Sequence, residues 1–483
     1  MKKNGEEGKS QTSSSRRKFL QTIGTATAGL IIAPYIKPGS VFAYKHHVSL
    51  SSQPQVGITQ TINTNADSYD PTTVKQKVQY LFDQLGGISD VVKAGDKVAI
   101  KINLTGGSGN ATSTLLNGVS ITEAMWTHPA VLQAVGELLI DAGVTAGDIY
   151  IVDSLWDTGS KAPFGSSDSF GYAAVQKALG CNMIDLNNAT PYSSFVDMST
   201  GSNPFNFASL KMNQILKDVD VYVSIPKLKQ HAEAGLTCSL KNQVGTVPKA
   251  LYTIQTNTGR RQQLHNPTGG ASNSYLPESI CDLNAARPVS LAVVDGIKNA
   301  KGGEGVWIST FVPYASHVLL AGKEPVSTDS IGAYLMGLDC EAKSLQLPDG
   351  KTTCDNYLDL LHTKGMGTNQ LKDINIVGDG ASLITSVRPH NDVRLPSNFL
   401  LLPNFPNPFN PSTRIVFYMP KAARVSVKVF TVTGSEIQTL VEGEVPAGQH
   451  DLYWSAEGLA SGVYLCRMET DNFSDTIKMI YMK

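Results

Sequence analysis

The sequence predicts an α/β protein with a mainly parallel, layered sheet, followed by a small all-β sandwich. Between residues 97 and 377, short β-branched runs alternate with segments whose apolar residues recur at helical spacing, which indicates βαβ units. After residue 411, short alternating strands follow at regular intervals with glycines between them, which is typical of a sandwich. The chain has 483 residues, enough for two or three domains and at least one sizeable core.

The composition is that of a globular protein and limits its partners. Hydrophobic residues make up 41% of the chain and charged residues 17%, and the formal net charge is -1, so we expect no nucleic-acid partner. The six cysteines include no C-x-x-C pair, which argues against a zinc knuckle or a ferredoxin-type iron–sulfur cluster in this chain. Cys340 and Cys354 are close enough in sequence for a disulfide, and two free buried thiols are the alternative.

Residues 1–43 are predicted to be an export signal. Residues 15–20 (SRRKFL) precede an apolar stretch at 23–33, and residues 41–43 (VFA) suit a signal peptidase. This pattern resembles a twin-arginine (Tat) signal; an ordinary secretory signal or a membrane anchor is the alternative. Pro34 interrupts an apolar run that is too short to span a bilayer, so we expect no stable transmembrane segment after signal removal. The resemblance implies transient contact with the Tat translocase and export of a folded protein, often with its cofactor.

Residues 44–395 are predicted to form the α/β domain, whose elements we expect in the following order. The helix that begins near Thr127 takes that residue as its cap and ends at Ala142 and Gly143. The other expected helices are 74–85, 172–179, 276–285, 325–338 and 356–361, and the expected strands are 97–103, 148–153, 182–186, 220–225, 289–295, 317–321 and 373–377.

The most informative stretch is residues 219–245. A buried strand is followed by Pro226, which cannot donate to a ladder and is expected to stop it. The predicted loop that follows is rich in groups that bind anions or metals: Lys227, Lys229, His231, Lys241 and Asn242. A solvated basic loop is the alternative.

Polar residues follow four of the predicted strands at the same end. These residues are Lys101 and Asn103, Asp153 and Ser154, Lys227 to His231, and Asp295. Because the carboxyl ends of parallel strands meet at one rim of a sheet, we expect these groups to converge on a single site. The expectation requires that all four strands share one sheet and one direction.

The candidate roles follow from side-chain chemistry. Imidazole titrates near neutral pH and binds metals, and lysines hold carboxylates or phosphates as point charges. The predicted catalytic residues are His231, Lys229 and Lys241; the predicted substrate-binding residues are Lys101, Asn103, Lys227 and Asn242; and the predicted metal ligands are His231, the loop residue His265, Asp295 and Glu304. No nucleotide-binding glycine motif and no G-x-S-x-G elbow is present, which disfavours nucleotide binding and serine hydrolase chemistry.

Residues 97–367 resemble the domain-of-unknown-function family 362 (DUF 362). The most specific part of the resemblance is P-K-L-K-x-H at 226–231 followed by L-K-N-x-x-G at 240–245, supported by D-S at 153–154 and D-G-I at 295–297. Members of this family often lie beside iron–sulfur or other redox modules, so the resemblance implies redox chemistry. The present chain departs from those members because it lacks a ferredoxin-type cysteine run.

The C-terminal part resembles a secretion signal of another kind. A Pro/Asn-rich linker is expected at 396–411, and an immunoglobulin-like sandwich at 412–483 with strands 413–418, 425–430, 436–440, 450–454, 462–469 and 476–482. The run NFPNPFNPST at 404–413 and GLASGVY at 458–464 resemble the type A C-terminal sorting domain of the type IX secretion system. The resemblance implies transient contact with that machinery and export through the periplasm to the cell surface or beyond. A plain adhesion module is the alternative.

Together these patterns predict an exported enzyme, metal- or redox-dependent, that acts on a small anionic substrate at the cell surface. A surface protein that binds an anionic ligand or a metal without turnover is the second hypothesis, and a structural or adhesive protein is the third. The sequence does not identify the cofactor, and it contains no iron–sulfur cysteine motif.

Overall fold

The computed structural model describes residues 53–482, except 63, 158, 160, 255–260, 267–274, 386–398, 402–403 and 405–408. The predicted Tat-type signal at 1–43 lies outside the described residues. No helix in the described part of the chain is long and apolar enough to cross a membrane.

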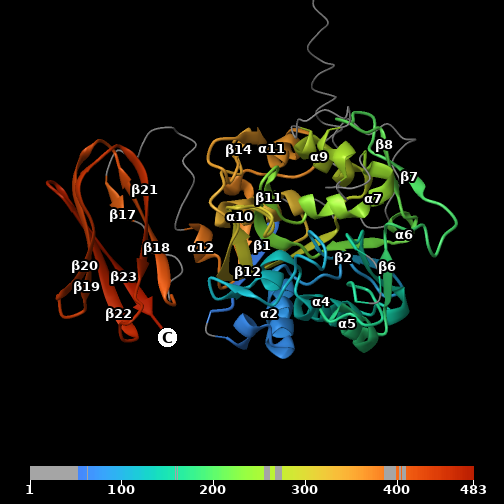
Figure 1. The fold of residues 1–483 in the computed structure, drawn as a ribbon, viewed down its shortest axis with the longest axis horizontal. Helices are drawn as coiled ribbons and strands as arrows, with labels where there is room; N and C mark the ends of the chain where they lie inside the picture. The colour runs from blue at the N-terminus through green and yellow to red at the C-terminus, as the bar shows by residue number, and fades with distance from the viewer. Residues whose placement is uncertain are drawn as a thin grey trace, which may run out of the picture. The chain divides into compact units, whose positions relative to one another are not determined.

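A ten-stranded mixed sheet forms the centre of the α/β domain (Figure 1). Its main path runs β16-β1-β13-β12-β9-β2-β5-β6, and β10 joins it by pairing with β12 and with β11. The strands are β1 (Gln55–Gln60), β2 (Val98–Lys101), β5 (Ile149–Asp153), β6 (Asn182–Asp185), β9 (Val221–Ser224), β10 (Lys227–His231), β11 (Gly235–Thr237), β12 (Leu291–Lys301), β13 (Val312–Gly322) and β16 (Asn375–Val377).

The four strands whose polar ends were expected to converge do share one sheet and one direction. β2 pairs in parallel with both β5 and β9, and β9 pairs in parallel with β12. The α/β prediction and its parallel core are therefore confirmed. The antiparallel pairs β12–β13 and β13–β1 make the sheet mixed at its other side.

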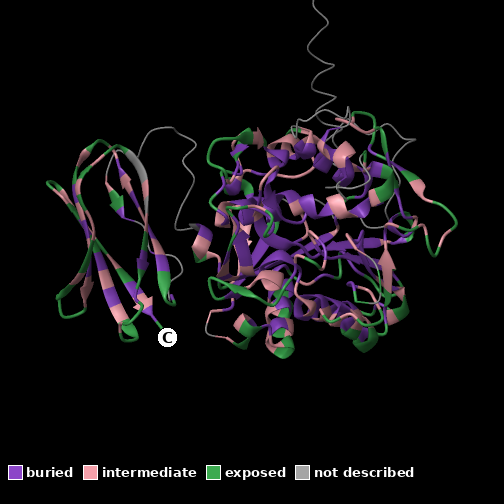
Figure 2. Cartoon of the chain, in the orientation of Figure 1, coloured by how far each residue is buried: buried purple, intermediate pink, exposed green. Residues whose placement is uncertain are grey.

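Helices cover both faces of this sheet, so the domain has three layers (Figure 1). Alternate strand residues divide between two cores, as the pleat requires: Ile100 and Val223 pack with α2, α4 and α5, whereas Ala99 and Tyr222 pack with α9, α10 and α11. Figure 2 shows the central strands of the sheet buried, whereas the residues of the two outermost strands, β6 and β16, are half-buried or exposed. The helices are α2 (Pro71–Gln84), α3 (Ile121–Met125), α4 (Pro129–Asp141), α5 (Tyr172–Leu179), α6 (Ile215–Asp218), α7 (Lys249–Tyr252), α8 (Gln262–His265), α9 (Leu276–Ala286), α10 (Pro325–Leu335), α11 (Tyr357–Thr363) and α12 (Ser382–Thr385), with 3₁₀ turns η1 (Asn65–Ser68), η2 (Ala146–Asp148), η3 (Lys241–Thr246) and η4 (Leu371–Asp373).

The stretch after Pro226 differs from the predicted loop. β9 ends at Ser224 as expected, but the chain resumes as strand β10, which pairs in parallel with β12 and antiparallel with β11. The lysines of β10 are fully buried, so a solvated basic loop is wrong. Residues 227–231 form a strand that was not predicted from the sequence. The two lysines argued against a strand there, because charged residues rarely occupy buried strands.

Two local predictions also need correction. His128, not Thr127, is the N-cap of α4, because its Nδ1 accepts a hydrogen bond from the Ala130 N–H. The Thr127 hydroxyl instead donates to the Ile225 carbonyl and accepts from the Asn103 N–H, tying α4 to two strands. His265 lies in the short helix α8 and not in a loop.

The C-terminal part is a β-sandwich, as predicted. A three-stranded sheet contains β17 (Leu400–Leu401), β18 (Ser412–Met419) and β21 (Gly448–Ser455), and a four-stranded sheet contains β20 (Glu436–Val445), β19 (Ala423–Thr431), β22 (Gly462–Thr470) and β23 (Phe473–Tyr481). Trp454 and Phe417 are among the apolar side chains between the sheets. Part of the expected linker therefore belongs to the sandwich, because β17 pairs with β18. The remaining two-stranded ladders are β3 (Leu115–Leu116) with β4 (Val119–Ser120), β7 (Val196–Ser199) with β8 (Ser209–Met212), and β14 (Ser344–Gln346) with β15 (Thr353–Asp355).

The cysteines are free thiols. Cys340 is buried and Cys354 half-buried, and neither forms a disulfide. Of the two alternatives for this pair, unpaired thiols are the one observed.

Candidate functional site

A cavity of about 540 Å³ opens at the carboxyl ends of β2 and β5, where such sites lie in parallel sheets. One part of its wall is charged and another carries the apolar side chains of Trp156, Trp307 and Ile308. The titratable lining residues are Lys101, Asp153, His231, Glu233, Lys241, Arg261, His265 and Glu304, and Asn103, Ser154, Asn242 and Gly245 contribute further polar or backbone atoms.

A buried ion pair forms the floor of the cavity. Lys101, the last residue of β2, places its Nζ 2.9 Å from Oδ1 of Asp153, the last residue of β5. Asp153 also accepts hydrogen bonds from the backbone N–H groups of Leu104 and Ser154. Burial lowers the pKa of Lys101, and the Asp153 carboxylate opposes that shift. Both charges are thus mutually compensated before any ligand binds.

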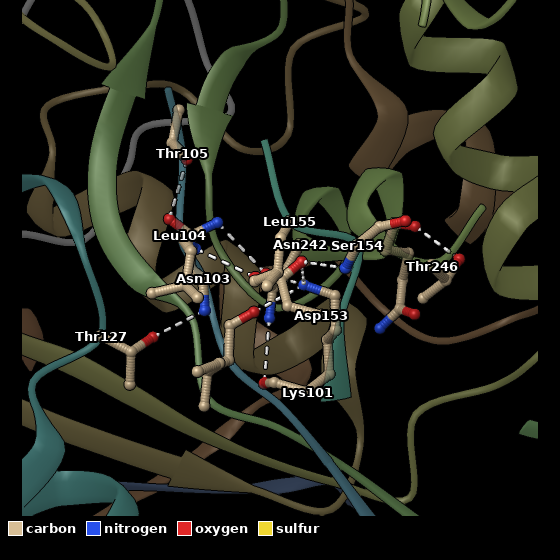
Figure 3. Close-up of polar contacts among 12 residues, drawn as sticks. Lys101, Asn103, Leu104, Thr105, Thr127, Asp153, Ser154, Leu155, Asn242 and Thr246 are labelled. Carbon is tan, nitrogen blue, oxygen red and sulfur yellow. Dashed lines mark hydrogen bonds and ion pairs between the residues drawn. The ribbon is translucent and has the colours of Figure 1, made fainter. Parts of the chain in front are cut away.

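Two asparagines connect this floor to its surroundings (Figure 3). Asn242 Oδ1 accepts from Lys101 Nζ and from Asn103 Nδ2, at 3.2 Å in each case. Asn103 Oδ1 accepts from Lys229 Nζ at 2.9 Å. Lys229 also donates to Thr105 and to the Met125 carbonyl, so its amine is fully used behind the cavity wall.

Lys241 differs from these lysines because its amine has no hydrogen-bond or ion-pair partner among the residues that the structure describes. It begins the turn η3 and is only 8% exposed, yet it lines the cavity. No oxygen of the described residues accepts a hydrogen bond from its Nζ or pairs with it. Burial lowers the pKa of Lys241 to about 8, with Arg261 acting in the same direction and Glu304 opposing it. Such an amine is suited to bind an anion or to exchange a proton near neutral pH.

Asp329 of α10 fixes the segment that presents Lys241. Its carboxylate is fully buried and accepts from the backbone N–H groups of Ser239 and Leu240, at 2.9 Å each, and from the Ser239 hydroxyl. Burial raises the pKa of Asp329 to about 6, although these donors act against the shift. The side chain therefore positions the turn from a layer outside the cavity.

Arg261 adds a second cation to the cavity wall. Its Nε and Nη2 donate to the backbone carbonyls of Val247 and Ser154, at 3.0 and 3.1 Å. No carboxylate of the described residues forms an ion pair with it, and burial lowers its pKa only to about 10, so it remains charged. The guanidinium is thus held in place by neutral groups, and its charge remains available to a ligand.

His231 and Glu304 lie together at the cavity, with Nε2 and Oε2 separated by 3.9 Å. His231 Nδ1 accepts from the Glu233 N–H, which leaves the proton of the neutral ring on Nε2, and burial lowers the pKa of His231 to about 3. Glu304 accepts from the Ala232 N–H and from Trp307 Nε1. Burial opposes ionisation of Glu304, but His231, the Ala232 N–H and Lys241 outweigh it and lower its pKa to about 2.

The predicted metal ligands do not come together as one set. His231 and Glu304 are neighbours, but His265 Nδ1 is paired with Glu233 Oε2 at 2.6 Å. Asp295 does not line the cavity. The described residues contain no group of three or more His, Cys, Asp or Glu side chains placed to hold a metal ion.

Asp295 belongs instead to a second buried cluster, together with Lys227. Lys227 Nζ lies 2.5 Å from Asp295 Oδ2 and 3.0 Å from the Tyr69 hydroxyl, which also donates to Asp295. The His128 N–H donates to the same carboxylate, and the His128 ring stacks on Tyr69 at 3.7 Å. Lys227 and Asp295 are fully buried and form an ion pair, and neither lines the cavity. The predicted contact of Lys227 with substrate stays a prediction.

The structure thus gathers seven of the predicted site residues at the cavity and places three elsewhere. Those at the cavity are Lys101, Asn103, His231, Lys241, Asn242, His265 and Glu304, and those outside it are Lys227, Lys229 and Asp295. The sequence analysis did not assign Arg261, Glu233, Trp156 or Trp307 to the site, although the structure places all four at the cavity. Glu233 lies within the stretch 219–245, where the lysines and His231 gave the stronger signal. Gly245 could have been found, since it ends the K-N-x-x-G pattern and its backbone lies against the Lys101–Asp153 pair.

Sequence comparisons agree with both halves of this architecture. Residues 98–334 match the profile described as "Domain of unknown function (DUF362)", and residues 404–482 match "Secretion system C-terminal sorting domain". The chain therefore contains a DUF362 domain, which carries the cavity, and a type IX C-terminal sorting domain. The latter indicates interaction with the secretion machinery and export to the cell surface or extracellular space.

A curated relative is the thylakoid-associated protein sll1697 of Synechocystis sp., 26% identical over 241 residues. The match covers 49% of the present chain and 63% of that protein, so the chain spans less than two thirds of its relative's length.

Two solved structures share weaker likeness. One is PorZ, an essential surface component of the type IX secretion system of Porphyromonas gingivalis. It is 21% identical, the match covers 19% of this chain and 12% of that chain, and the TM-score is 0.14. The other is the lactate racemase apoprotein from Thermoanaerobacterium thermosaccharolyticum. It is 12% identical, the match covers 56% of each chain, and the TM-score is 0.31. Neither score reaches that of a shared fold, so the fold assignment rests on the sheet order itself.

Proposed function

We propose that the protein is a surface-exported enzyme that binds a small organic anion in the cavity and acts on it by acid–base chemistry. The observation that carries the proposal is the buried Lys241 amine, which faces the cavity without a partner among the described residues. An unpaired buried cation is costly, and an anionic ligand would relieve that cost. By contrast, Lys101 is already neutralised by Asp153.

Lys241 and Arg261 would hold the anionic group of the substrate. A guanidinium presents donors in a fork that matches a carboxylate or a phosphate, and the Lys241 ammonium adds a point charge. The neutral His231 ring, with its proton on Nε2, would donate a hydrogen bond to substrate. Because the pKa of Lys241 is about 8, this amine would also exchange a proton at neutral pH.

Dependence on a metal or a redox cofactor stays a prediction. His231 and Glu304 are the two predicted ligands that lie together, and Glu304 already accepts from two N–H groups. A metal held there would take further ligands from substrate or water. Elemental analysis and an absorption spectrum of the full chain and of His231→Ala would test this part. A stoichiometric metal lost from the variant would support it, and a colourless, metal-free protein that binds substrate normally would contradict it.

The anion proposal is tested by calorimetric titration of the full chain with inorganic phosphate, acetate and succinate. We expect at least one of these anions to bind wild type, and Lys241→Met to lose that binding by a factor of about 10 or more, as one charge-assisted hydrogen bond contributes about 1.5–3 kcal/mol. Lys211→Met is the matched control, since Lys211 is exposed and paired with Asp197. Equal binding by wild type and Lys241→Met would refute the assignment.

A binding protein without turnover is the alternative, and the same variants distinguish it. Once a ligand is known, its fate is followed by NMR. Chemical conversion that is lost in His231→Gln, with ligand affinity retained, supports the enzyme. Stable binding without conversion in wild type supports the binding protein.

A further inference from the structure

We propose that Lys241 is a covalent-catalysis residue whose amine condenses with the carbonyl group of a small oxo-carboxylate, such as a 2-oxo acid, to form an imine. The inference rests on the proposed function, because it uses the same cavity and the same anion-binding groups. It goes further by naming the class of substrate and the bond that forms.

The first argument is the availability of the amine. The other three lysines of this region are committed: Lys101 to Asp153, Lys227 to Asp295, and Lys229 to three oxygen atoms behind the wall. Lys241 has no such partner in the described part of the chain. It also differs from a surface lysine, because only 8% of the residue is exposed and this residue lines a cavity of about 540 Å³. A carbonyl compound in that cavity would meet an amine that has no hydrogen bond to the described residues to break.

The second argument is the charge state of the amine. Only the uncharged amine is a nucleophile, and burial lowers the pKa of Lys241 to about 8. At pH 7 roughly a tenth of such amines are uncharged, which is about 300-fold more than for a lysine with the ordinary pKa of 10.5. Desolvation beside another cation, here Arg261, is an established way to activate a lysine for imine formation.

The third argument is the presence of groups for the rest of the substrate. Arg261 is fixed by two backbone carbonyls and can bind a carboxylate, which would hold the neighbouring carbonyl carbon in the cavity. The Nε2–H of His231 is a donor for the carbonyl oxygen, and Glu304 beside it is ionised. The three kinds of group required, namely a nucleophile, a group that binds the carboxylate and a hydrogen-bond donor to the carbonyl oxygen, all line one cavity.

The step is balanced without an oxidant or a reductant. The uncharged amine attacks the carbonyl carbon, a C–N bond forms as the C=O π bond breaks, and one proton passes from the nitrogen to the former carbonyl oxygen, which gives a neutral carbinolamine. The nitrogen lone pair then forms the C=N bond as the C–O bond breaks, and the departing hydroxyl group takes the remaining nitrogen proton and leaves as water. One water molecule is released for each imine formed, and the imine nitrogen can take a proton from solvent.

Borohydride trapping tests this inference on the full chain. The protein is mixed separately with pyruvate, glyoxylate and 2-oxoglutarate, reduced with sodium borohydride, and mapped by peptide mass spectrometry. With a true substrate analogue, Lys241 should gain the mass of the oxo acid less one oxygen atom, in a saturable reaction that accelerates between pH 7 and pH 9. Lys241→Arg should lose this adduct, whereas Lys211→Arg should retain it.

The outcomes separate the imine from the anion site. Adducts absent from Lys241 with all three oxo acids, or spread evenly over surface lysines, would overturn the imine. If succinate or phosphate binding still depended on Lys241, the proposed function would stand without it. If Lys241→Arg does not fold, the position of the label in the wild-type peptide map decides the question alone.

Discussion

Replacement of Gly245 by alanine tests the most crowded contact of the site. A Cβ at this position would lie 2.6 Å from Asp153 Oδ1 and 2.7 Å from Lys101 Nζ. The backbone conformation of Gly245, with φ of −81° and ψ of 15°, is one that alanine adopts without strain, so the effect is purely steric. The methyl group must either displace the buried ion pair or shift η3 away from it.

The expected cost is about 1–3 kcal/mol for inserting one carbon into a packed region, and it approaches about 3–5 kcal/mol if the ion pair is broken. We expect a lower free energy of unfolding in urea denaturation, followed by far-UV circular dichroism, and weaker anion binding in calorimetry. Gly147→Ala is the matched control, because no atom lies within 4 Å of a Cβ at that position and its φ is not positive. Its stability should lie within about 0.5 kcal/mol of wild type.

A Gly245→Ala protein as stable as wild type, with unchanged anion binding, would refute this reasoning. It would mean that η3 does not lie against the Lys101–Asp153 pair as described. A loss of the same size in Gly147→Ala would instead point to a general sensitivity to methyl insertion.

Three further predictions concern buried charges. The folded-state pKa of Lys241, about 8, lies below the ordinary 10.5, so between these pH values the native state binds fewer protons at Lys241 than the unfolded state does, and Lys241 makes stability rise with pH from about 8 to 10.5. Lys241→Met should reduce the rise of the free energy of unfolding over this range and should be more stable than wild type at pH 7, by up to about 3 kcal/mol in denaturant titrations. In the same assay, Asp329→Ala should lower the free energy of unfolding by at least about 2 kcal/mol, because two buried N–H groups lose their acceptor, and Asp329→Asn should lower it less. Equal losses of stability in the two variants would contradict the positioning role. Lys227→Met should lower the free energy of unfolding by about 3–5 kcal/mol, because it leaves Asp295 charged and buried, and the double variant Lys227→Met/Asp295→Leu should recover part of that stability. Additive losses of stability in the double variant would disprove the pairing.

The sequence was most informative where burial alone determines structure. The runs that became β2, β5 and β9 are β-branched and apolar, and a strand buried on both faces of a sheet requires little else. Their shared direction followed from the helices between them, and it correctly brought Lys101 and Asp153 to one place. The predicted helix 172–179 also has the bounds of α5, because the glycines on either side, Gly171 and Gly180, define its two ends.

Pairing of charges could not be predicted in the same way. Lys227 and Lys229 look like surface residues, and their burial depends on Asp295 and on Asn103, which are distant in sequence. A register shift in the pairing of β10 with β12 lies between these two lysines, and their amines reach different clusters although they are only two residues apart. Arg261 gave no signal either, because its contacts are backbone carbonyls and any sequence provides those.

The position of β1 has a consequence for how the protein is made. This strand is the first in the described part of the chain, yet its two partners in the sheet are β13 and β16, which follow it by roughly 250 and 320 residues. At about 5–20 residues per second, a ribosome needs on the order of 10–50 s to deliver even the first of these partners. During that interval both backbone edges of β1 remain open to pairing with other chains. Synthesis of β16, rather than of any earlier segment, therefore sets the earliest moment at which both edges of β1 can be covered within the nascent chain.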